Sequence, residues 1–161
     1  MPEIIVIAHN IRSTHNVGAI FRTAEGFGIS KIILSGYTPY PTTKYDTRLP
    51  HISEKLTAQI HKTALGAETM VPFEYLELPP LVQLKNTGFR IVGLEQSERS
   101  VALNEYIAPD KIALLIGEEV HGIQDALLDH CEDIIEIPMV GKKESFNVSV
   151  ATGIALYSLS I

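Results

Sequence analysis

The sequence predicts an α/β protein built on a mostly parallel sheet that is flanked by helices. Two observations predict this class. Short apolar runs rich in β-branched residues alternate along the chain with helix-like stretches, and this alternation is typical of a parallel sheet covered by helices. Glycines and prolines separate these segments, and the chain shows no internal repeat, low-complexity tract or linker. We therefore expect residues 1–161 to form one domain with a substantial core.

The first half of the chain is divided by glycine and proline residues. Strands are expected where β-branched residues follow one another, and helices where apolar residues recur every three or four positions. Gly28 and Gly66 each mark the end of a helix, while Gly36 and three prolines mark a long loop. The expected elements are a strand at Glu3–Ala8, a helix at Asn16–Phe27, a strand at Lys31–Leu34, a loop at Ser35–Pro50 and a helix at His51–Leu65.

The second half continues the alternation with shorter segments. Pro79-Pro80 must break or restart any helix that contains them, and the last helix is almost free of charge. The expected elements are a strand at Thr69–Phe73, a helical stretch at Glu74–Asn86, strands at Phe89–Leu94 and Lys111–Ile116, a helix at Gln124–Cys131, a strand at Ile134–Ile137 and a helix at Ser145–Leu159.

The composition is that of an ordinary folded protein, with 45% hydrophobic and 20% charged residues. No apolar run reaches the roughly 18–20 residues that a membrane span requires, and Met1-Pro2-Glu3 lacks the basic start of a signal peptide. The single cysteine, Cys131, excludes an internal disulfide and favours a reducing compartment. We therefore expect a cytoplasmic protein that does not engage a membrane.

The net charge of −6 argues against a protein that binds a polyanion over its whole surface. A local basic patch stays possible, because several Lys and Arg residues lie in segments expected to be loops or helix starts. These residues are Arg12, Arg22, Lys44, Arg48, Lys142 and Lys143. An ordinary solvated surface is the alternative interpretation of the same residues.

The first polar cluster follows the first strand. Asn16 is expected to cap the next helix, on which Gly18 and Gly26 each lie four residues from Arg22. Residues at this spacing share one side of a helix, so small neighbours leave the Arg22 guanidinium room for a ligand or a second chain. The alternative is an ordinary surface arginine on an amphipathic helix.

The second polar cluster lies in the segment LLIGEEVHGI, where a strand ends before Gly117 and Gly122 leads to the next helix. Gly117 is expected to let a ligand approach the backbone. Glu118 and Glu119 are adjacent and are expected to point apart, so that only one of them faces a site. A charged loop between two glycines is the alternative.

The third polar cluster lies between the last strand and the last helix. Pro138 fixes the exit of the loop, and Gly141 permits an unusual backbone angle. Ser145, Asn147 and Ser149 stand at the start of an otherwise apolar helix, where unpaired amides carry a partial positive charge. A simple capping role for these side chains is the alternative. Such an apolar helix is expected to be buried on most sides, in part by a second copy of the chain.

Several other chemistries lack their sequence signatures. The chain contains no G-x-x-x-x-G-K-[ST] loop, no complete G-x-G-x-x-G and no H-E-x-x-H, and no G-x-S-x-G elbow. Its six histidines are scattered without metal-ligand spacing, so no metal is expected. His9, His15 and His121 lie near the polar clusters and are interpreted as surface or core residues.

Taken in order, the three clusters resemble the motifs of the SpoU/TrmH family of RNA 2′-O-ribose methyltransferases, within the SPOUT superfamily. The third motif is highly specific, and the intervals between motifs also fit, so the resemblance covers essentially the whole chain. The matching residues are Asn16, Arg22 and Thr23 for N-x-x-x-x-x-R-T, Gly117, Glu119 and Gly122 for G-x-E-x-x-G, and Ile137 to Ala151 for I-P-M-x-G-x-x-x-S-[LF]-N-V-S-x-A.

The resemblance implies a SPOUT fold whose C-terminal stretch is threaded into a trefoil knot. It also implies a homodimer with the site beside the subunit interface, an RNA substrate, and S-adenosylmethionine (AdoMet) as cofactor, held largely by backbone groups. The cofactor contacts that the motifs imply are Gly117, Ile137, Met139, Ser145 and Phe146, with Leu94 as a further candidate.

The resemblance implies that Arg22 is the residue that activates the ribose 2′-hydroxyl. It would act as a base only if its environment removed its proton, because a free arginine is almost always charged; otherwise it would stabilise the developing alkoxide. Both roles stay open. Glu119 is preferred to Glu118 because the motif counts two residues from Gly117. The remaining residues expected to orient arginine, phosphate and ribose are Asn16, Ser145 and Asn147.

The sequence departs from the family pattern at Phe146, where leucine is common, and we expect no appended RNA-binding domain. The leading hypothesis is an AdoMet-dependent RNA 2′-O-methyltransferase, with tRNA ahead of rRNA as substrate. The alternative is a cofactor-binding pseudo-enzyme or RNA assembly factor that transfers no methyl group. A receiver-type regulatory module is disfavoured, because the first strand ends in His9 and Asn10 and not in a carboxylate cluster.

Overall fold

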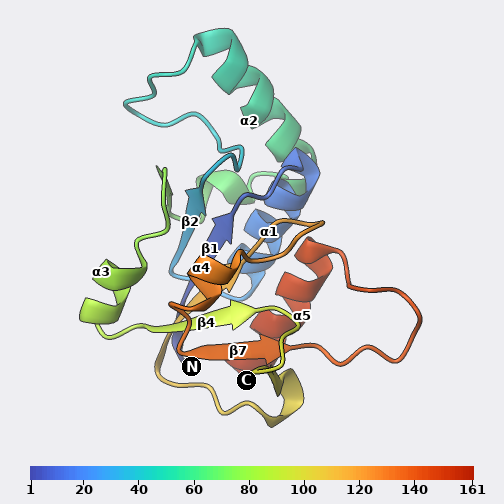
Figure 1. Cartoon of the computed structure of the whole chain (residues 1–161). Coiled ribbons are helices and arrows are strands. Elements are labelled where there is room, and N and C mark those ends of the chain that lie inside the picture. The colour runs from blue at the N-terminus through green and yellow to red at the C-terminus, as the bar shows by residue number, and fades with distance from the viewer.

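The centre of the molecule is a seven-stranded sheet, seen in the computed structural model of residues 1–161 (Figure 1). All neighbouring strands in the sheet are parallel, which confirms the predicted α/β class. From one edge to the other the strands are β3 (Phe73–Leu76), β2 (Lys31–Ser35), β1 (Glu3–His9), β6 (Lys111–Ile116), β4 (Arg90–Leu94), β7 (Asp133–Glu136) and β5 (Val101–Ala102).

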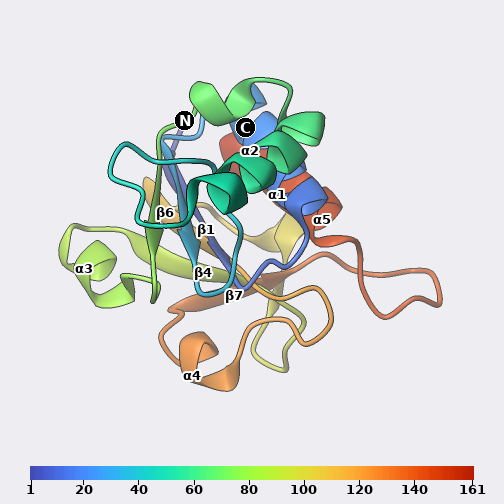
Figure 2. The same cartoon turned by 90° about the horizontal axis from the view of Figure 1, so that it is seen from above.

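Helices cover both faces of this sheet (Figure 2). Helices α1, α2 and α5 lie on one face, and α1 packs against both of the others. The short helices α3 and α4 lie on the opposite face. No helix is both long enough and apolar enough to span a membrane. The helices are α1 (Thr14–Gly26), α2 (Pro50–Ala64), α3 (Leu81–Asn86), α4 (Asp125–Leu128) and α5 (Val148–Ser160), with 3-10 turns at Ala67–Thr69 and Leu103–Glu105.

Strand β1 shows why the sheet needs cover on both faces. Its side chains alternate between the faces, and every residue after Glu3 is buried. Val6 and Ala8 belong to the large apolar cluster beneath α1 and α5, whereas Ile5 and Ile7 belong to the smaller cluster beneath α3 and α4. A strand buried on both faces needs consecutive apolar residues, and this is the pattern that predicted the strand.

Helix α1 approaches α2 most closely at Gly18. A methyl group on Gly18 would lie 2.0 Å from the Thr63 hydroxyl oxygen and 2.3 Å from the Ile60 carbonyl oxygen. Gly18 therefore makes room for a neighbouring helix, and not for a ligand at Arg22 as the sequence had suggested.

We expect Gly18→Ala to lower the free energy of unfolding by about 1–3 kcal/mol, because the added methyl group must push α1 away from α2. Gly26→Ala is the matched control on the same helix. Its methyl group would meet no atom within 4 Å, and alanine favours a helix over glycine by roughly 0.5–1 kcal/mol. Urea denaturation measures both variants, and equal stabilities would contradict the close contact of the two helices.

Two elements expected in the middle of the chain are wrong. Thr69–Phe73 is not a strand, because β3 begins only at Phe73 and continues to Leu76. The helix expected at Glu74–Asn86 is reduced to α3, which starts after Pro80. A proline cannot donate a backbone hydrogen bond within a helix, so residues 73–76 are free to pair with β2 instead. Strand β5 was not expected, since two residues show no periodicity.

A largely exposed loop of residues 137–147 joins β7 to α5 and projects from the body of the molecule (Figure 1). Helix α5 begins at Val148, three residues after the expected start at Ser145. The trefoil knot that the family resemblance implies stays a prediction.

Candidate active site

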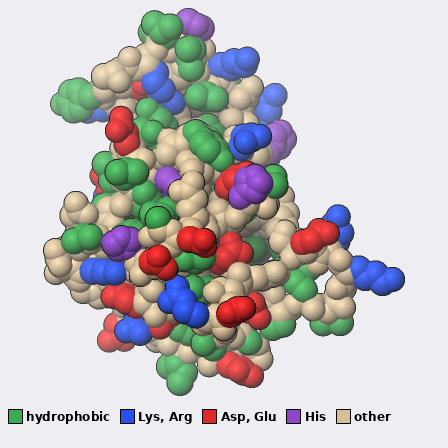
Figure 3. Space-filling model, viewed as in Figure 1, with side chains coloured by type: hydrophobic (Ala, Val, Ile, Leu, Met, Phe, Trp, Pro, Cys, Tyr) green, Lys and Arg blue, Asp and Glu red, His purple; other side chains and the backbone are tan.

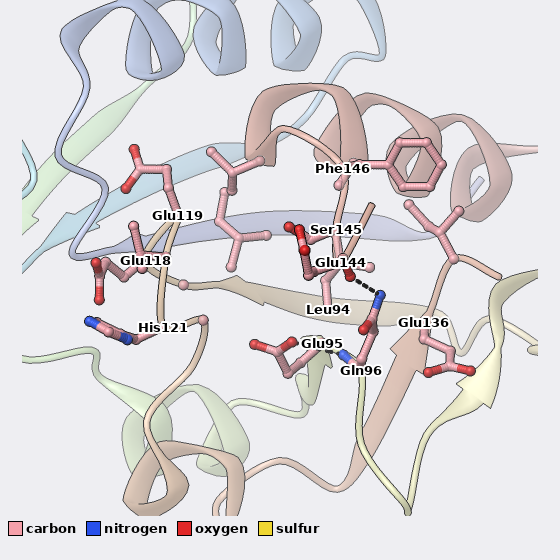
Figure 4. Close-up of a pocket in the computed structure, with 17 residues that line it drawn as sticks. Leu94, Glu95, Gln96, Glu118, Glu119, His121, Glu136, Glu144, Ser145 and Phe146 are labelled. Atoms are coloured by element: carbon pink, nitrogen blue, oxygen red, sulfur yellow. Dashed lines mark hydrogen bonds between the residues drawn. The ribbon is translucent and has the colours of Figure 1, made fainter. Parts of the chain in front are cut away.

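A pocket lies at the carboxyl ends of β4, β6 and β7 (Figure 4). Its walls come from residues 94–96 after β4, residues 116–122 at the end of β6, and the chain on both sides of the long loop before α5. The cavity measures about 270 Å³, which is far more than one water molecule needs. Ligands of parallel sheets bind at this edge, so this pocket is the candidate active site.

The wall formed by residues 117–122 is a tight turn. The Gly122 amide donates to the Glu118 carbonyl at 2.8 Å, and Gly122 has a φ of 68°, which favours glycine. A methyl group on Gly117 would lie 2.6 Å from the Gly122 carbonyl carbon. The close neighbour that requires glycine at position 117 is thus the turn itself, whereas the sequence had suggested a ligand.

Glu95 holds this turn against the end of β4. Its carboxylate accepts hydrogen bonds from the backbone N–H of Ile123 at 2.9 Å and of Gln96 at 2.8 Å. A methyl group on Gly122 would lie 1.9 Å from a Glu95 carboxylate oxygen. Glu95 therefore fixes the position of the pocket wall that carries Glu119.

The Glu119 carboxylate joins the second polar cluster to the first. It accepts hydrogen bonds from the backbone N–H groups of Arg12 at 3.2 Å and Ser13 at 3.3 Å. It also accepts one from the Asn16 side-chain amide at 3.2 Å. Its neighbour Glu118 makes no side-chain hydrogen bond, and the two acids point apart as expected (Figure 4). Both line the pocket, so the expectation that only one of them would face a site is wrong.

The third cluster joins this network through Asn147. The Asn147 amide nitrogen donates to the Asn16 side-chain oxygen at 3.2 Å. The Asn147 side-chain oxygen accepts from the backbone N–H of Ser149 at 2.9 Å and of Val150 at 3.3 Å. A continuous chain of hydrogen bonds therefore runs from the start of α5 through Asn147 and Asn16 to Glu119.

The helix caps differ from those expected, and the difference explains the network. Ser13, and not Asn16, is the N-cap of α1, because the Ser13 hydroxyl accepts the Asn16 backbone N–H at 3.2 Å. The Asn16 side chain is thereby left to bond to Glu119. Asn147, and not Ser145, is the N-cap of α5, so the capping role that was the alternative interpretation applies to Asn147.

The charge state of Glu119 follows from these contacts. Burial disfavours its ionised form, but hydrogen bonds from backbone N–H groups, including those of Arg12 and Ser13, and from the Asn16 amide outweigh burial and lower its pKa. The carboxylate is therefore charged at neutral pH, which makes its hydrogen bonds stronger than those of a neutral acceptor.

The pocket brings together most of the residues expected to contact the cofactor. The lining includes Leu94, Gly117, Ile137, Ser145 and Phe146, together with the expected Glu119. Met139 is the one expected cofactor contact that does not line it.

Arg22 does not line the pocket of its own chain. It lies on α1 with an exposed side chain, and its guanidinium makes no hydrogen bond or ion pair in the structure. Its assignment as the residue that activates the ribose hydroxyl stays a prediction.

The three histidines near the clusters take different places. His9 is buried, its Nδ1 lies 2.8 Å from the Ser35 hydroxyl oxygen, and burial lowers its pKa. His15 and His121 are exposed, although His121 does line the pocket. His9 is therefore a core residue, as interpreted from the sequence.

Sequence reasoning missed two residues that shape the pocket, Glu95 and Gln96. Gln96 donates from its side-chain amide to the Glu144 carbonyl at 2.9 Å, and this is the only hydrogen bond between residues 138–146 and the rest of the chain. Both residues directly follow β4. Their position at a strand end was the one signal that could have identified them.

Comparisons with known proteins agree with this geometry. Residues 3–157 match the SpoU rRNA Methylase family. Over 155 residues the chain is 32% identical to the tRNA (guanosine(18)-2′-O)-methyltransferase of Aquifex aeolicus. This match covers 96% of this chain and 67% of that relative. Over 159 residues it is 33% identical to a 23S rRNA (guanosine-2′-O-)-methyltransferase of Neisseria meningitidis, covering 96% of this chain and 57% of that relative.

The fold is also shared with a solved structure, that of an AdoMet-bound rRNA methyltransferase from Sinorhizobium meliloti. The TM-score is 0.80 at 24% identity, and the match covers 98% of this chain and 55% of that one. The chain thus spans between about half and two thirds of the length of these proteins.

Proposed function

This chain belongs to the SpoU rRNA methylase family, and from that premise we propose that it is an AdoMet-dependent RNA 2′-O-ribose methyltransferase. One observation carries the proposal. The three family motifs, which are more than 100 residues apart at their extremes, are joined by the hydrogen bonds from Asn147 to Asn16 and from Asn16 to Glu119, beside one pocket. If each motif only stabilised its own part of the fold, the three would not need to be hydrogen-bonded to one another beside a single pocket.

The residues that line the pocket fit the proposed cofactor. AdoMet carries a sulfonium, an ammonium and a carboxylate, which leaves it with a net positive charge, and it supplies an electrophilic methyl group when bound. Carboxylates favour such a cation, and apolar lining side chains suit an adenine ring. The carboxylates of the lining are Glu95, Glu118, Glu119, Glu136 and Glu144, and its apolar residues include Leu94, Ile116, Ile137 and Phe146.

Other residues of this chain would activate the ribose hydroxyl and orient the RNA. A ribose hydroxyl must lose its proton as its oxygen takes the methyl group. The Arg22 guanidinium would stabilise the oxygen as negative charge develops, or accept the proton if its own charge is suppressed. Asn16, Asn147 and Glu119 would orient the ribose and phosphate, with Ser145 at the mouth of the pocket.

We further propose a homodimer, because Arg22 is absent from the pocket of its own chain. A shallow hollow between α1 and α5 is lined largely by apolar atoms, and α5 leaves Val150, Ile154 and Tyr157 exposed there. A second copy that covers this face would bury these side chains. It would also bring the Arg22 of one subunit beside the pocket of the other.

The proposed substrate is a structured RNA, with tRNA ahead of rRNA, in the cytoplasm. Relatives of similar identity are named for both substrates, so the assay must offer both. Purified protein is incubated with AdoMet labelled in the methyl group and with separate tRNA and rRNA fractions. Recovery of a labelled 2′-O-methyl nucleoside after nuclease digestion is the expected result. Cofactor binding without transfer to any RNA would instead support the pseudo-enzyme alternative.

Gln96 offers a test of the loop that closes the pocket. Because its amide makes the only hydrogen bond from residues 138–146 to the rest of the chain, we expect Gln96→Ala to weaken AdoMet binding about 2- to 10-fold, the value of one net hydrogen bond. Gln96 is exposed, so the thermal stability should not change. Calorimetric titration measures the affinity.

Gln83→Ala is the matched control, since Gln83 is an exposed glutamine on α3. An affinity loss of equal size in both variants would show that Gln96 does not position the loop.

A further inference from the structure

The charge of the chain is divided unevenly along its length. Residues 1–66 contain seven Lys and Arg against four Asp and Glu, a net charge of +3, whereas residues 67–161 contain six against fifteen, a net charge of −9. In the space-filling view the ionisable side chains of the upper lobe, which is built from α2 and the loop before it, are mainly Lys, Arg and His (Figure 3). Acidic side chains gather over the middle and lower parts. The protein therefore has one basic region although its net charge is negative.

This basic region contains a groove. The groove lies between the loop after β1, the segment after β2, and α2. Its floor is formed by Tyr40 and Tyr75, whose rings stack with centroids 4.1 Å apart. The Arg48 guanidinium lies 3.5 Å from the Tyr40 centroid and donates hydrogen bonds to the Asp46 carboxylate and to the Tyr40 carbonyl. Arg48 is thus fully engaged in building the floor.

The rim of the groove is also fixed by the fold. The Tyr37 backbone N–H donates to the Asn10 side-chain oxygen at 3.0 Å. The Thr38 hydroxyl donates to the Ala8 carbonyl at 3.0 Å and accepts from the Ile11 backbone N–H at 3.0 Å. These bonds tie the loop after β1 to the segment after β2. Tyr37 is therefore held in place although its ring is exposed.

Two pairs of a cation and an aromatic ring lie in this basic region. Arg12 and Tyr37 line the groove, whereas Lys44 and Tyr45 lie outside its lining, on the loop before α2. Arg12 lies 5.9 Å from the centroid of Tyr37, which is 51% exposed, and Lys44 lies 5.4 Å from the centroid of Tyr45, which is 84% exposed. The Arg12 guanidinium and the Lys44 amine make no hydrogen bond or ion pair. Exposed rings beside free cations suit single-stranded nucleic acid, because the rings stack on unpaired bases and the cations neutralise phosphates.

The groove and the pocket share one wall. The backbone N–H groups of Arg12 and Ser13 donate to Glu119, which lines the pocket, and the same two residues line the groove. An RNA strand with its ribose at the pocket would therefore pass the groove with its neighbouring nucleotides.

We propose that Arg12 and Tyr37 at the groove, together with Lys44 and Tyr45 on the loop before α2, form an RNA-binding rim that holds unpaired nucleotides flanking the methylated ribose. Tyr37 stacks on an unpaired base, and Arg12 and Lys44 contact the adjoining phosphates. This assignment rests on the proposed function. It adds that the substrate is recognised through a loop or single-stranded segment, and that the recognition resides on the basic lobe of an otherwise acidic protein.

The test uses fluorescence anisotropy with a labelled RNA stem-loop and a fully paired duplex of the same length. We expect Tyr37→Leu to weaken binding of the stem-loop about 5- to 150-fold, the range for one base stacked on an aromatic ring, and to leave duplex binding nearly unchanged. Tyr37→Phe keeps the ring face and should bind as the wild type does. Arg12→Gln should reduce the slope of log K against log salt by about 0.7, the value for one phosphate contact to a single strand.

Lys85→Gln is the control for loss of a positive charge outside the basic lobe, and calorimetric AdoMet binding is measured for every variant. Wild-type RNA affinity in both Tyr37→Leu and Arg12→Gln, with cofactor binding intact, would overturn the rim. An equal loss for stem-loop and duplex would overturn the stacking role. Failure of the wild type to bind AdoMet would instead contradict the proposed function, so the two failures are distinguishable.

Discussion

Arg22→Ala is expected to lose methyl transfer by about 10²–10³-fold or more, while AdoMet binds with wild-type affinity. The rate falls because a group that stabilises charge only as the reaction proceeds contributes to the transition state and not to the bound cofactor. The affinity is kept because Arg22 does not line the pocket of its own chain. Single-turnover transfer at saturating cofactor measures the first quantity, and calorimetry measures the second.

Two variants control this experiment. Arg22→Lys keeps the charge without the planar guanidinium and should retain only part of the activity. Glu25→Ala alters an exposed position on the same helix and should leave the rate unchanged. Methyl transfer at the wild-type rate in Arg22→Ala would remove Arg22 from the mechanism.

Mixed dimers decide whether Arg22 acts across the subunit interface. One chain carries Arg22→Ala and the other carries Gly117→Val, whose side chain cannot fit against the Gly122 backbone. If Arg22 serves the partner's pocket, the mixed dimer contains one complete site and recovers activity that neither homodimer has. If Arg22 serves its own pocket, no complete site exists and mixing restores nothing. Circular dichroism of each chain verifies its fold beforehand.

Glu119→Gln is expected to lower kcat/KM about 10- to 100-fold, because it disrupts the contact between the first and second motifs. A carboxylate can accept from Arg12 N–H, Ser13 N–H and the Asn16 amide together. A glutamine has one oxygen, and its own amide would face one of these donors. Hydrogen bonds to a charged group contribute roughly 1.5–3 kcal/mol. Steady-state kinetics measure the loss, with the RNA fraction that accepts the methyl group as substrate.

Glu118→Gln is the matched control, since Glu118 is the adjacent acid in the same pocket and its side chain makes no hydrogen bond. A loss of the same size in both variants would mean that the pocket senses total negative charge and not the network at Glu119.

The pKa of Glu119 adds a dependence on pH. Its folded-state pKa lies below the ordinary value of 4.5, so its contribution to stability is complete above pH 4.5 and is lost as the pH falls through the folded-state value. The free energy of unfolding of the wild type should therefore fall in acid by an amount that Glu119→Gln does not show. Urea denaturation of both proteins over a range of pH measures this difference.

The sequence pattern located most strands well, for a physical reason. Strands β1, β2, β4, β6 and β7 lie within one residue of their expected bounds, because strands buried on both faces need consecutive apolar residues. Strand β3 breaks this rule. It lies at the sheet edge, where half-buried residues such as Glu74 and Tyr75 are tolerated, and its local sequence therefore resembles a helix as much as a strand.

The sequence by itself determined the α/β class, the polar clusters at strand ends and the family. Local preferences are sufficient for these, because they act over a few neighbouring residues. Only the tertiary structure decided that Asn16 bonds to both Glu119 and Asn147, that Glu95 and Gln96 hold two walls of one pocket, and that Gly18 serves helix packing. Hydrogen bonds between residues more than 100 positions apart require ångström-level placement of whole elements, and the order of parallel strands in the sheet provides that placement.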